Sequence, residues 1–525
     1  MIRRVVVLTC ALLAMFAGSA QASGREGSPT HEADSKLDAA LLARAHSTRA
    51  DEIPLRKSRV IVRTSDGRPA SALIDAVSGR AGRYFAWLGG QVAIVPDAAL
   101  EWLASQPEVA ALSLDRAVRG TIDRTARAIG ARWITDTLGV DGFGVGVATI
   151  DSGVAPYHDD LDGRVLQFVD FVSGQASAYD DYGHGTHVAG IIAGNGRSSN
   201  GERRGIAPAA HLVVLKALDA AGNGFTSTVI AAIDYAIAHR AEFNIRVINL
   251  SVAAGVYESY LKDPLTLAAK RAVDAGIVVV AAAGNNGLAA NGAAEYGGIA
   301  SPGNAPWVLT VGASNLMGTV ERGDDVVAAF SSRGPSAIDN GAKPDLVAPG
   351  VGIEAATEAA SALFAAQPTL RLAGAIHTAS EPYMSLTGTS MAAPVVAGAI
   401  ALMLEANPEL TPNAVKAILQ YTAETRKGFD HFTQGAGFLN ARGAVELARA
   451  FVDPASAALS LDPVAWSRQI IWGNRRIRGR QLGAHANAWA LGVTWGDRRT
   501  ASGELVEWGL ICGAECGDGS EGIRR

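Results

Sequence analysis

The sequence has little cysteine, no long block of like charge and few long hydrophobic runs. Only three of the 525 residues are cysteines, too few for a disulfide framework that would hold a fold of this size. No cluster of histidine and cysteine has the spacing of zinc ligands, which argues against a zinc site. Forty-six basic residues face 51 acidic ones, and the net charge of −5 gives no reason to expect a nucleic-acid partner.

One long hydrophobic run does occur, and it lies at the N-terminus. Arg3 and Arg4 precede an apolar stretch from Val5 to Ala17, and small residues follow up to Ala22. This pattern is typical of a secretory signal peptide, and the run is shorter than the roughly 20 residues that span a bilayer. We therefore expect residues 1–22 to be a signal peptide, the protein to be secreted or periplasmic, and the rest of the chain to contain no membrane span.

Two cysteines remain once this segment is removed. Cys10 would be lost with the signal peptide, and Thr9 before it argues against a lipoprotein anchor. Cys512 and Cys516 lie four residues apart near the C-terminus, where they either close a small disulfide loop or stay free.

The composition of the remaining chain is that of a folded protein, with 48% hydrophobic and 18% charged residues. Residues 23–52 are polar and without periodicity, so we expect a flexible linker there. Residues 53–122 show strand and helix patterns in the order β-α-β-β-α-β, which predicts a small ferredoxin-like α+β domain. The expected strands are 59–64, 84–88, 91–95 and 109–114, and the expected helices are 71–78 and 98–105, the second capped by Asp97.

The character of the chain changes over residues 123–452, where apolar runs alternate with helical stretches. This alternation predicts an α/β fold of three layers, with a mostly parallel sheet covered on both faces. Ligand sites in such sheets lie beyond the carboxyl ends of the strands. The expected strands are 145–150, 211–218, 247–250, 277–283 and 308–311, and two expected helices are 227–239 and 265–275.

Residues 453–525 form a C-terminal extension that is rich in tryptophan. Five of the nine tryptophans of the chain lie here, and three of them are followed by glycine. The spacing is irregular, so we interpret the segment as a degenerate aromatic repeat of short strands, whose role the sequence leaves open. The five are Trp466, Trp472, Trp489, Trp495 and Trp508.

Three segments carry residues suited to acyl transfer. Asp151 ends a strand-like run and begins an Asp-Ser-Gly turn, His184 lies in Gly-His-Gly-Thr-His where a helix should begin, and Ser390 lies in Gly-Thr-Ser before a long apolar stretch. Acyl transfer needs a nucleophile, a base and a group that orients the base. Each segment alone is common, but the three together, in the order Asp, His, Ser, predict a catalytic site.

These segments resemble the three signature blocks of the subtilisin-like serine protease family (subtilases, peptidase family S8). Further similar segments fill the intervals, so that the resemblance covers about residues 125–450. It implies that Ser390 is the nucleophile, His184 its base and Asp151 the group that orients His184. It also implies that Asn285 is an oxyanion donor, together with the backbone N–H of Ser390. The further segments are 247–251, 278–287, 330–335 and 343–350.

The resemblance also implies where a peptide substrate binds. It would lie extended between Gly222-Asn223-Gly224 and Ser251-Val252-Ala253, through main-chain hydrogen bonds. Ala253 and Ala254 stand where the best-known members have glycine, so the primary pocket should be slightly narrowed. The rest of its wall, 281–284 with Gly284, is small and uncharged, which predicts broad or apolar specificity.

Three residues near His184 could share or influence its role. His187 competes with it in His-Gly-Thr-His, but the resemblance makes the first histidine catalytic, and we interpret His187 as structural. Asp180 and Asp181 either tune His184 or form a solvated acidic turn, and we favour the turn.

The domain at 53–122 resembles the family's propeptide, which inhibits the enzyme within the same chain until it is cleaved off. Self-cleavage would then fall between Arg116 and Arg127, releasing a monomeric protease for protein and peptide substrates. Subtilases often bind calcium, and the loop Asn195–Glu202 lies in a comparable region without a recognisable ligand pattern. We expect no metal in the catalytic site and no cofactor for catalysis.

Two other functions remain open. A catalytically silent subtilase would act as a binding or surface protein through its tryptophan-rich extension, although silent members lose a residue of the triad. A peptide ligase or a processing enzyme with one narrow partner fits the same residues. Sedolisins, which share the fold, have Glu in place of the catalytic histidine and are excluded by His184.

Overall fold

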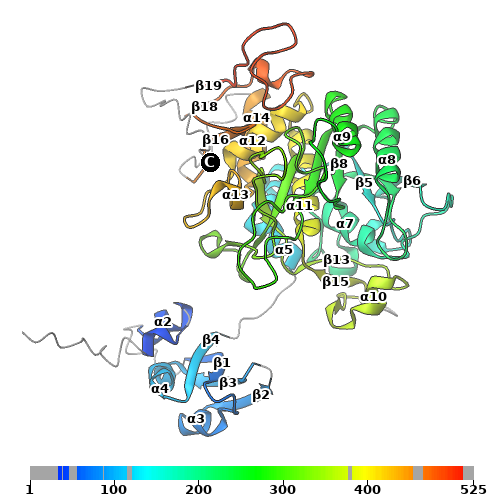
Figure 1. The fold of residues 1–525 in the computed structure, drawn as a ribbon. Helices are drawn as coiled ribbons and strands as arrows, with labels where there is room; N and C mark the ends of the chain where they lie inside the picture. The colour runs from blue at the N-terminus through cyan, green and yellow to red at the C-terminus, as the bar shows by residue number, and fades with distance from the viewer. Residues whose placement is uncertain are drawn as a thin grey trace, which may run out of the picture. The chain divides into compact units, whose positions relative to one another are not determined.

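The computed structural model describes residues 33–37, 39–46, 56–86, 88–114, 121–376, 381–452, 465–479 and 481–511 (Figure 1). The chain divides into two compact units, residues 1–117 and residues 118–525. The predicted signal peptide, residues 116–120 of the predicted cleavage region, and both C-terminal cysteines lie outside the described residues.

The first unit contains a four-stranded antiparallel sheet in the order β2-β3-β1-β4. Two helices connect its strands in the order β-α-β-β-α-β, which is the ferredoxin-like arrangement expected from the sequence. Val60, Val62, Ile74 and Leu103 are fully buried between the sheet and the helices. The elements are β1 (Lys57–Thr64), α3 (Ser71–Ala76), β2 (Arg80–Phe85), β3 (Gly90–Pro96), η2 (Asp97–Ala99), α4 (Leu100–Ser105) and β4 (Val109–Leu114).

The structure corrects three details of this unit. Part of the predicted linker is folded, because helix α2 (Ala39–Ala45) places Leu41 in the core of the unit and Leu37 forms a bridge with Leu112. Strand β2 begins at Arg80 and not at Tyr84; none of its residues is buried, so no apolar pattern marks its start. Asp97 does not cap α4; its carboxylate accepts a hydrogen bond of 2.6 Å from Ser58 Oγ.

The second unit is built on an eight-stranded sheet in the order β11-β10-β9-β8-β5-β7-β6, with β12 also beside β10. All neighbours are parallel except β10 and β11. All six residues of β5 are buried, as a strand covered on both faces requires. The strands are β5 (Gly146–Asp151), β6 (Val165–Asp170), β7 (His211–Lys216), β8 (Ile245–Leu250), β9 (Val278–Ala282), β10 (Leu309–Asn315), β11 (Val326–Val327) and β12 (Leu346–Pro349).

Helices cover both faces of this sheet, as the alternating pattern predicted (Figure 1). Helices α8 and α9 pack on one face, where Ala148 and Ile248 point, and helices α7 and α11 pack on the other, where Val147 and Val247 point. The edge strand β6 has half-buried side chains and therefore no continuous apolar run that would have predicted it. The helices are α7 (His184–Ala193), α8 (Thr226–Ala238), α9 (Pro264–Asp274), α11 (Thr389–Ala406), α12 (Pro412–Thr422) and α14 (Ala441–Val452).

Shorter elements complete the second unit. Helix α5 begins it and buries Ile122 in the core around α11. The short elements are α5 (Thr121–Ala128), α6 (Ala131–Trp133), η3 (Ile134–Leu138), η4 (Asp159–Leu161), η5 (Arg197–Ser199), η6 (Arg322–Asp324), β13 (Ile353–Ala356), α10 (Ala362–Ala366), η7 (Pro368–Leu370), β14 (Arg371–Leu372), β15 (Tyr383–Leu386) and α13 (His431–Gln434).

Helix α11 has the length and the apolar composition of a membrane span. Only the N-terminal run was singled out from the sequence for these properties, and this helix was overlooked. However, 83% of this 18-residue helix is buried inside the second unit, where it contacts strands β8, β9 and β10. Its hydrophobicity is that of a helix enclosed by the protein, and α11 is the only helix in the described ranges that passes this test.

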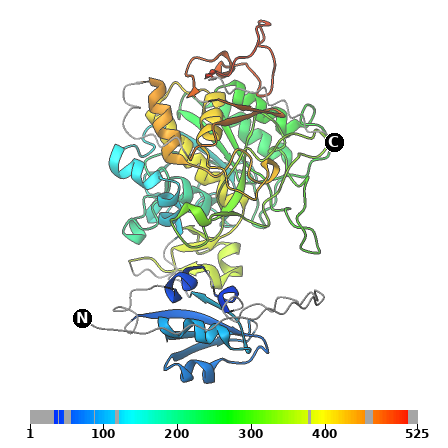
Figure 2. The ribbon, with the colours of Figure 1, turned by 90° about the vertical axis from the view of Figure 1, so that its left-hand side faces the viewer.

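The C-terminal extension packs into the second unit as a set of short strands, in agreement with the sequence. Figures 1 and 2 show it beside α12, and Asn413 of α12 donates to the carbonyls of Ala488 and Val493 at 2.9 and 2.8 Å. Trp472 is 1% exposed, with its ring centroid 4.5 Å from that of Trp495. The elements are β16 (Gln469–Trp472), β17 (Arg475–Arg478), β18 (Gln481–Leu482), η9 (Asn487–Trp489) and β19 (Leu510–Ile511).

Candidate active site

Three side chains predicted to carry the chemistry lie at the carboxyl-terminal edge of the large sheet. Asp151 is the last residue of β5, His184 is the first residue of α7, and Ser390 is the second residue of α11. Glycines precede both helices, and Gly183 has φ +99°, a conformation that other residues rarely adopt. The sequence therefore starts both helices close to the end of β5, where ligand sites of parallel sheets are found.

Asp151 and His184 are joined by a hydrogen bond of 2.8 Å between Oδ1 and Nδ1. The same oxygen accepts a hydrogen bond from Ser152 N at 2.8 Å, and Asp151 is 1% exposed. Burial alone would lower the pKa of His184, but the negative charge and the hydrogen bond of Asp151 outweigh it, and the pKa is raised. With the Nδ1 proton held by Asp151, the neutral ring keeps Nε2 free to accept a proton.

Ser390 makes a reciprocal contact with Ser251. The Ser390 hydroxyl donates to the carbonyl oxygen of Ser251 at 2.9 Å, and the Ser251 hydroxyl donates to the carbonyl of Ser390 at 2.8 Å. Among the described residues, Ser390 makes no hydrogen bond to His184, so the expected pairing of the two is not formed in this structure. Rotation about the Cα–Cβ bond of Ser390 is the movement that redirects its hydroxyl.

Asn285 and the start of α11 present two N–H donors close together. The side-chain oxygen of Asn285 accepts hydrogen bonds of 3.0 Å from both the backbone N–H and the hydroxyl of Thr389, and Nδ2 has no acceptor among the residues that the structure describes. Ser390 N lies in the first turn of α11, where backbone donors have no partner within the helix. A methyl group on Gly388 would lie 3.5 Å from Asn285 Nδ2 and 3.7 Å from Ser390 N.

Gly388→Ala should therefore reduce the activity of this site without harming the fold. Gly388 has φ 162°, an extended conformation open to alanine, and its methyl group would meet no atom closer than 3.5 Å. That methyl would occupy the space in front of the two donors, and blocking such donors costs about 10²-fold in kcat. The measurement is kcat together with Tm, with Gly323→Ala as the control, because Gly323 has open space around its Cα. An unchanged kcat would show that these donors do not act on the substrate.

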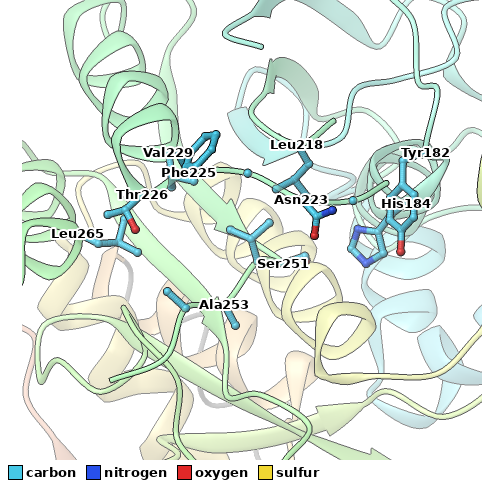
Figure 3. Close-up of a pocket in the computed structure, with 14 residues that line it drawn as sticks. Tyr182, His184, Leu218, Asn223, Phe225, Thr226, Val229, Ser251, Ala253 and Leu265 are labelled. Carbon is cyan, nitrogen blue, oxygen red and sulfur yellow. The ribbon is translucent and has the colours of Figure 1, made fainter. Parts of the chain in front are cut away.

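Two cavities open at the candidate site and share Ser251, Ala253 and Ala254. The first has a volume of about 390 Å³ and is lined by His184 and by all of the predicted substrate segments, Gly222-Asn223-Gly224 and Ser251-Val252-Ala253 (Figure 3). Leu218, Val229 and Leu265 give its wall an apolar character, with Val229 and Leu265 at the end away from His184 (Figure 3).

The second cavity, of about 450 Å³, contains Ser390 and Asn285. Gly284, Ala282 and Ala300 line it, and no charged side chain does. The sequence-predicted residues thus lie around two connected cavities, with Asp151 buried behind His184.

Two residues of this region were not identified from the sequence. The ring of Tyr182 packs against the backbone of Gly222 and lines the first cavity together with His184. Thr389 holds the amide of Asn285. The signal for Tyr182 was its position two residues before His184 in a stretch otherwise rich in glycine and aspartate.

The interpretation of Asp180 as part of a solvated turn is wrong. Asp180 is buried and accepts four hydrogen bonds, from Ser152 Oγ, Gly183 N and both the N–H and the hydroxyl of Thr186, at 2.6–2.8 Å. Burial raises the pKa of this carboxyl, although the hydrogen bonds oppose the shift. Its neighbour Asp181 accepts a hydrogen bond of 2.6 Å from Lys216 Nζ. Both carboxylates therefore organise the segment that leads into α7.

His187 is fully buried on the same helix as His184. Its Nε2 lies 3.1 Å from the carbonyl oxygens of both Ile353 and Met384, which belong to β13 and β15. Burial lowers the pKa of His187 to about 3, so the ring is neutral at physiological pH. Its contacts tie α7 to this small sheet and leave it no access to either cavity.

In the loop Asn195–Glu202, where calcium was considered, the side chains of Asn195 and Ser199 make hydrogen bonds within the protein. Asn195 uses its side-chain oxygen to accept from Arg197 N and its amide to donate to Asp159 O, and Ser199 Oγ accepts from Arg203 N. Nowhere in the described part of the chain do three or more His, Cys, Asp or Glu side chains gather in a way that could hold a metal ion.

Comparison with known proteins gives a consistent result. Residues 142–438 match the model of the subtilase family. The chain is 37% identical over 358 residues to the serine protease AprX of Bacillus subtilis (strain 168), covering 67% of this chain and 78% of AprX. It is 31% identical over 377 residues to subtilisin E of the same strain, covering 71% and 85% of the two chains.

Two further matches cover a smaller share of this chain. An extracellular serine proteinase of Thermus sp. (strain Rt41A) is 31% identical over 352 residues, which cover 65% of this chain and 72% of the relative. A cold-adapted subtilisin-like serine proteinase of known crystal structure is 31% identical, with a TM-score of 0.42, and the match covers 57% of this chain and 88% of that one.

Proposed function

Because the chain belongs to the subtilase family and is a subtilisin-like serine protease, we propose that Asp151, His184 and Ser390 carry out its catalysis. The observation that carries this assignment is the 2.8 Å hydrogen bond between Asp151 and His184, next to the cavity that contains Ser390. The reaction is hydrolysis of peptide bonds inside protein substrates through an acyl-enzyme.

The chemistry follows from the roles of the three side chains. His184 Nε2 takes the proton of the Ser390 hydroxyl as its oxygen attacks the scissile carbonyl, and Asp151 holds the ring in the required tautomer. Asn285 Nδ2 and Ser390 N donate to the oxyanion. His184 then gives the proton to the leaving amine, and water activated by the same ring hydrolyses the acyl-enzyme.

The substrate lies as an extended strand between the two segments of the first cavity. Gly224, Val252 and Ala253 make no backbone hydrogen bonds to the rest of the described chain, so their main-chain groups are free to pair with a peptide. A peptide N–H that bonds to the Ser251 carbonyl would displace the Ser390 hydroxyl from it. The uncharged lining of the second cavity favours small or apolar side chains before the scissile bond.

The first unit acts as the inhibitor of the second until the chain cuts itself between them. The predicted cleavage region, 116–127, narrows to the bonds before Thr121, because Thr121 begins α5 and Ile122 is fully buried. Secretion is supported by the pattern of residues 1–22 and by the relative from Thermus, which is named an extracellular proteinase. The mature protease works as a monomer without a cofactor.

The acid limb of kcat/KM should have its midpoint above the ordinary histidine pKa of about 6.5. His184 accepts a proton only in its neutral form, and its pKa in the free enzyme is raised by Asp151. Activity is therefore complete at pH values above the raised pKa and is lost as the pH falls through it. Initial rates at low substrate concentration from pH 4 to 9 measure this midpoint. A midpoint below 6.5 would contradict the effect assigned to Asp151.

The experiment that tests the proposal combines a peptide library with a serine-directed phosphonate. We expect cleavage of internal peptide bonds after small or apolar residues, and complete loss of cleavage when one phosphonate is attached at Ser390. Mass spectrometry of the labelled protein identifies the modified residue. Cleavage that continues after labelling, or a label on another serine, would contradict the assignment.

A further inference from the structure

Lys216 is a lysine without any solvent exposure beside the proposed catalytic residues. It is the last residue of β7, and the parallel pairing of β5 and β7 places it directly opposite Asp151. Burying an ammonium group is costly unless hydrogen bonds and an opposite charge compensate it. A charged residue at this position therefore requires specific partners.

The ammonium group of Lys216 uses all three of its hydrogens. It donates to the carbonyl oxygens of Ser152 at 2.6 Å and Leu218 at 2.9 Å, and to the carboxylate of Asp181 at 2.6 Å. It also lies 4.6 Å from the centre of the Tyr179 ring, close enough for a cation–π contact.

These three acceptors belong to three different segments of the site. Ser152 follows Asp151, Asp181 lies three residues before His184, and Leu218 belongs to the wall of the first cavity. One buried group thus holds the segment of the orienting carboxylate, the segment of the base and the edge of the substrate cavity.

The contacts of Ser152 extend this connection to His184. The Ser152 N–H donates to the catalytic oxygen of Asp151, and its hydroxyl accepts from the N–H of Gly185, the second residue of α7, at 2.9 Å. The Ser152 carbonyl faces Lys216. Release of that carbonyl would therefore move both partners of the Asp151–His184 hydrogen bond.

We propose that Lys216 is a positioning residue of the protease, which holds Asp151 and His184 in bonding register by tying Ser152, Asp181 and Leu218 to one ammonium group. This role rests on the proposed function of the triad. Lys216 touches neither the substrate nor the reacting atoms, and its effect on the rate passes through the geometry of the Asp151–His184 pair.

The test uses the full-length protein with Lys216→Met and Asp181→Asn. Methionine keeps the length of the side chain but removes the charge and the donors. We expect kcat to fall by about 10²-fold in Lys216→Met, since small displacements of catalytic groups have effects of this size. Asp181→Asn, which weakens only one of the three contacts, should give a smaller fall in kcat. Lys270→Met is the matched control, because Lys270 also pairs with a carboxylate, Asp274, and lies over a ring, but on the outer side of α9.

A second readout separates positioning from general stability. The downfield proton resonance of the His184 Nδ1–H, bonded to Asp151, should shift or disappear in folded Lys216→Met and stay unchanged in Lys270→Met. A wild-type kcat together with an unchanged resonance in Lys216→Met would overturn the proposal. If Lys216→Met does not fold, the same two measurements on Asp181→Asn decide, because Asp181 is partly exposed and its replacement leaves two contacts in place. A wild-type protein that fails to react with the phosphonate would refute the triad, whereas the resonance would still report on Lys216.

Discussion

Ser390→Ala should abolish peptide hydrolysis and accumulate as an uncut precursor. The alanine removes the Ser390 hydroxyl, which lies in one cavity with Asn285 at the first turn of α11. Loss of a triad nucleophile lowers kcat by at least about 10⁴-fold, and the remaining rate is too low for self-cleavage. The measurements are kcat on a peptide substrate and the size of the purified protein on a denaturing gel.

The matched control is Ser227→Ala. Ser227 is also the second residue of a helix, α8, but its side chain is exposed and makes no contact with the candidate site. It should mature and act as the wild type does. Added active protease should cut the Ser390→Ala precursor before Thr121, which would show that the bond is accessible and that only the nucleophile is lacking. Maturation of purified Ser390→Ala by itself would contradict self-processing.

Removal of residues 453–525 should prevent the second unit from folding stably. The extension covers α12 and contributes Trp472, Trp489 and Trp495 to the same hydrophobic core as α11. The side-chain oxygen of Gln420 in α12 would also lose the hydrogen bond of 2.6 Å that it accepts from the backbone N–H of Ile471, and Gln420 is fully buried. The truncated protein should therefore expose apolar surface and aggregate, which size-exclusion chromatography and thermal unfolding would measure.

A point substitution tests the same idea in a chain of full length. Trp472→Ala should lower the free energy of unfolding by about 3–5 kcal/mol, the usual cost of emptying a large buried site. Leu505→Ala, in the same extension but 62% exposed, should change it by less than about 0.5 kcal/mol. A soluble, active protein that ends at residue 452 would show that the extension is dispensable for the fold.

The sequence predicted best those strands of the fold that are buried on both faces. Strands β5, β7 and β9 are covered on both faces and therefore read as unbroken apolar runs. Strand β6 lies at the edge of the sheet with mostly half-buried side chains, and Gln167 interrupts its apolar run. Ala33, Leu37 and Leu41 follow each other at intervals of four, a helical spacing that a mainly polar composition concealed.

The sequence indicated which residues form the candidate site, but it did not indicate which contacts they make with one another. Asp151 and His184 were proposed from local motifs at the end of a strand and the start of a helix, and Asn285 from the resemblance to subtilases. The contact of the Ser390 hydroxyl with Ser251 depends on one side-chain rotation, which no sequence pattern specifies. Lys216 was visible only as a single charge at the end of an apolar run, and its partners come from three distant segments.

The burial of the tryptophans changes the interpretation of the C-terminal extension. An aromatic surface for binding partners would need exposed rings, whereas Trp472, Trp489 and Trp495 are each less than 5% exposed. The alternative of a silent binding protein was based on a tryptophan-rich binding surface, and these three buried rings do not provide one.

The packing of the extension also has a consequence for the timing of biosynthesis. Trp472 and Trp495 follow α12 in the chain, and α12 lacks this cover until they have left the ribosome. The core around α11 and α12 can therefore be completed only after residue 495 has been synthesised.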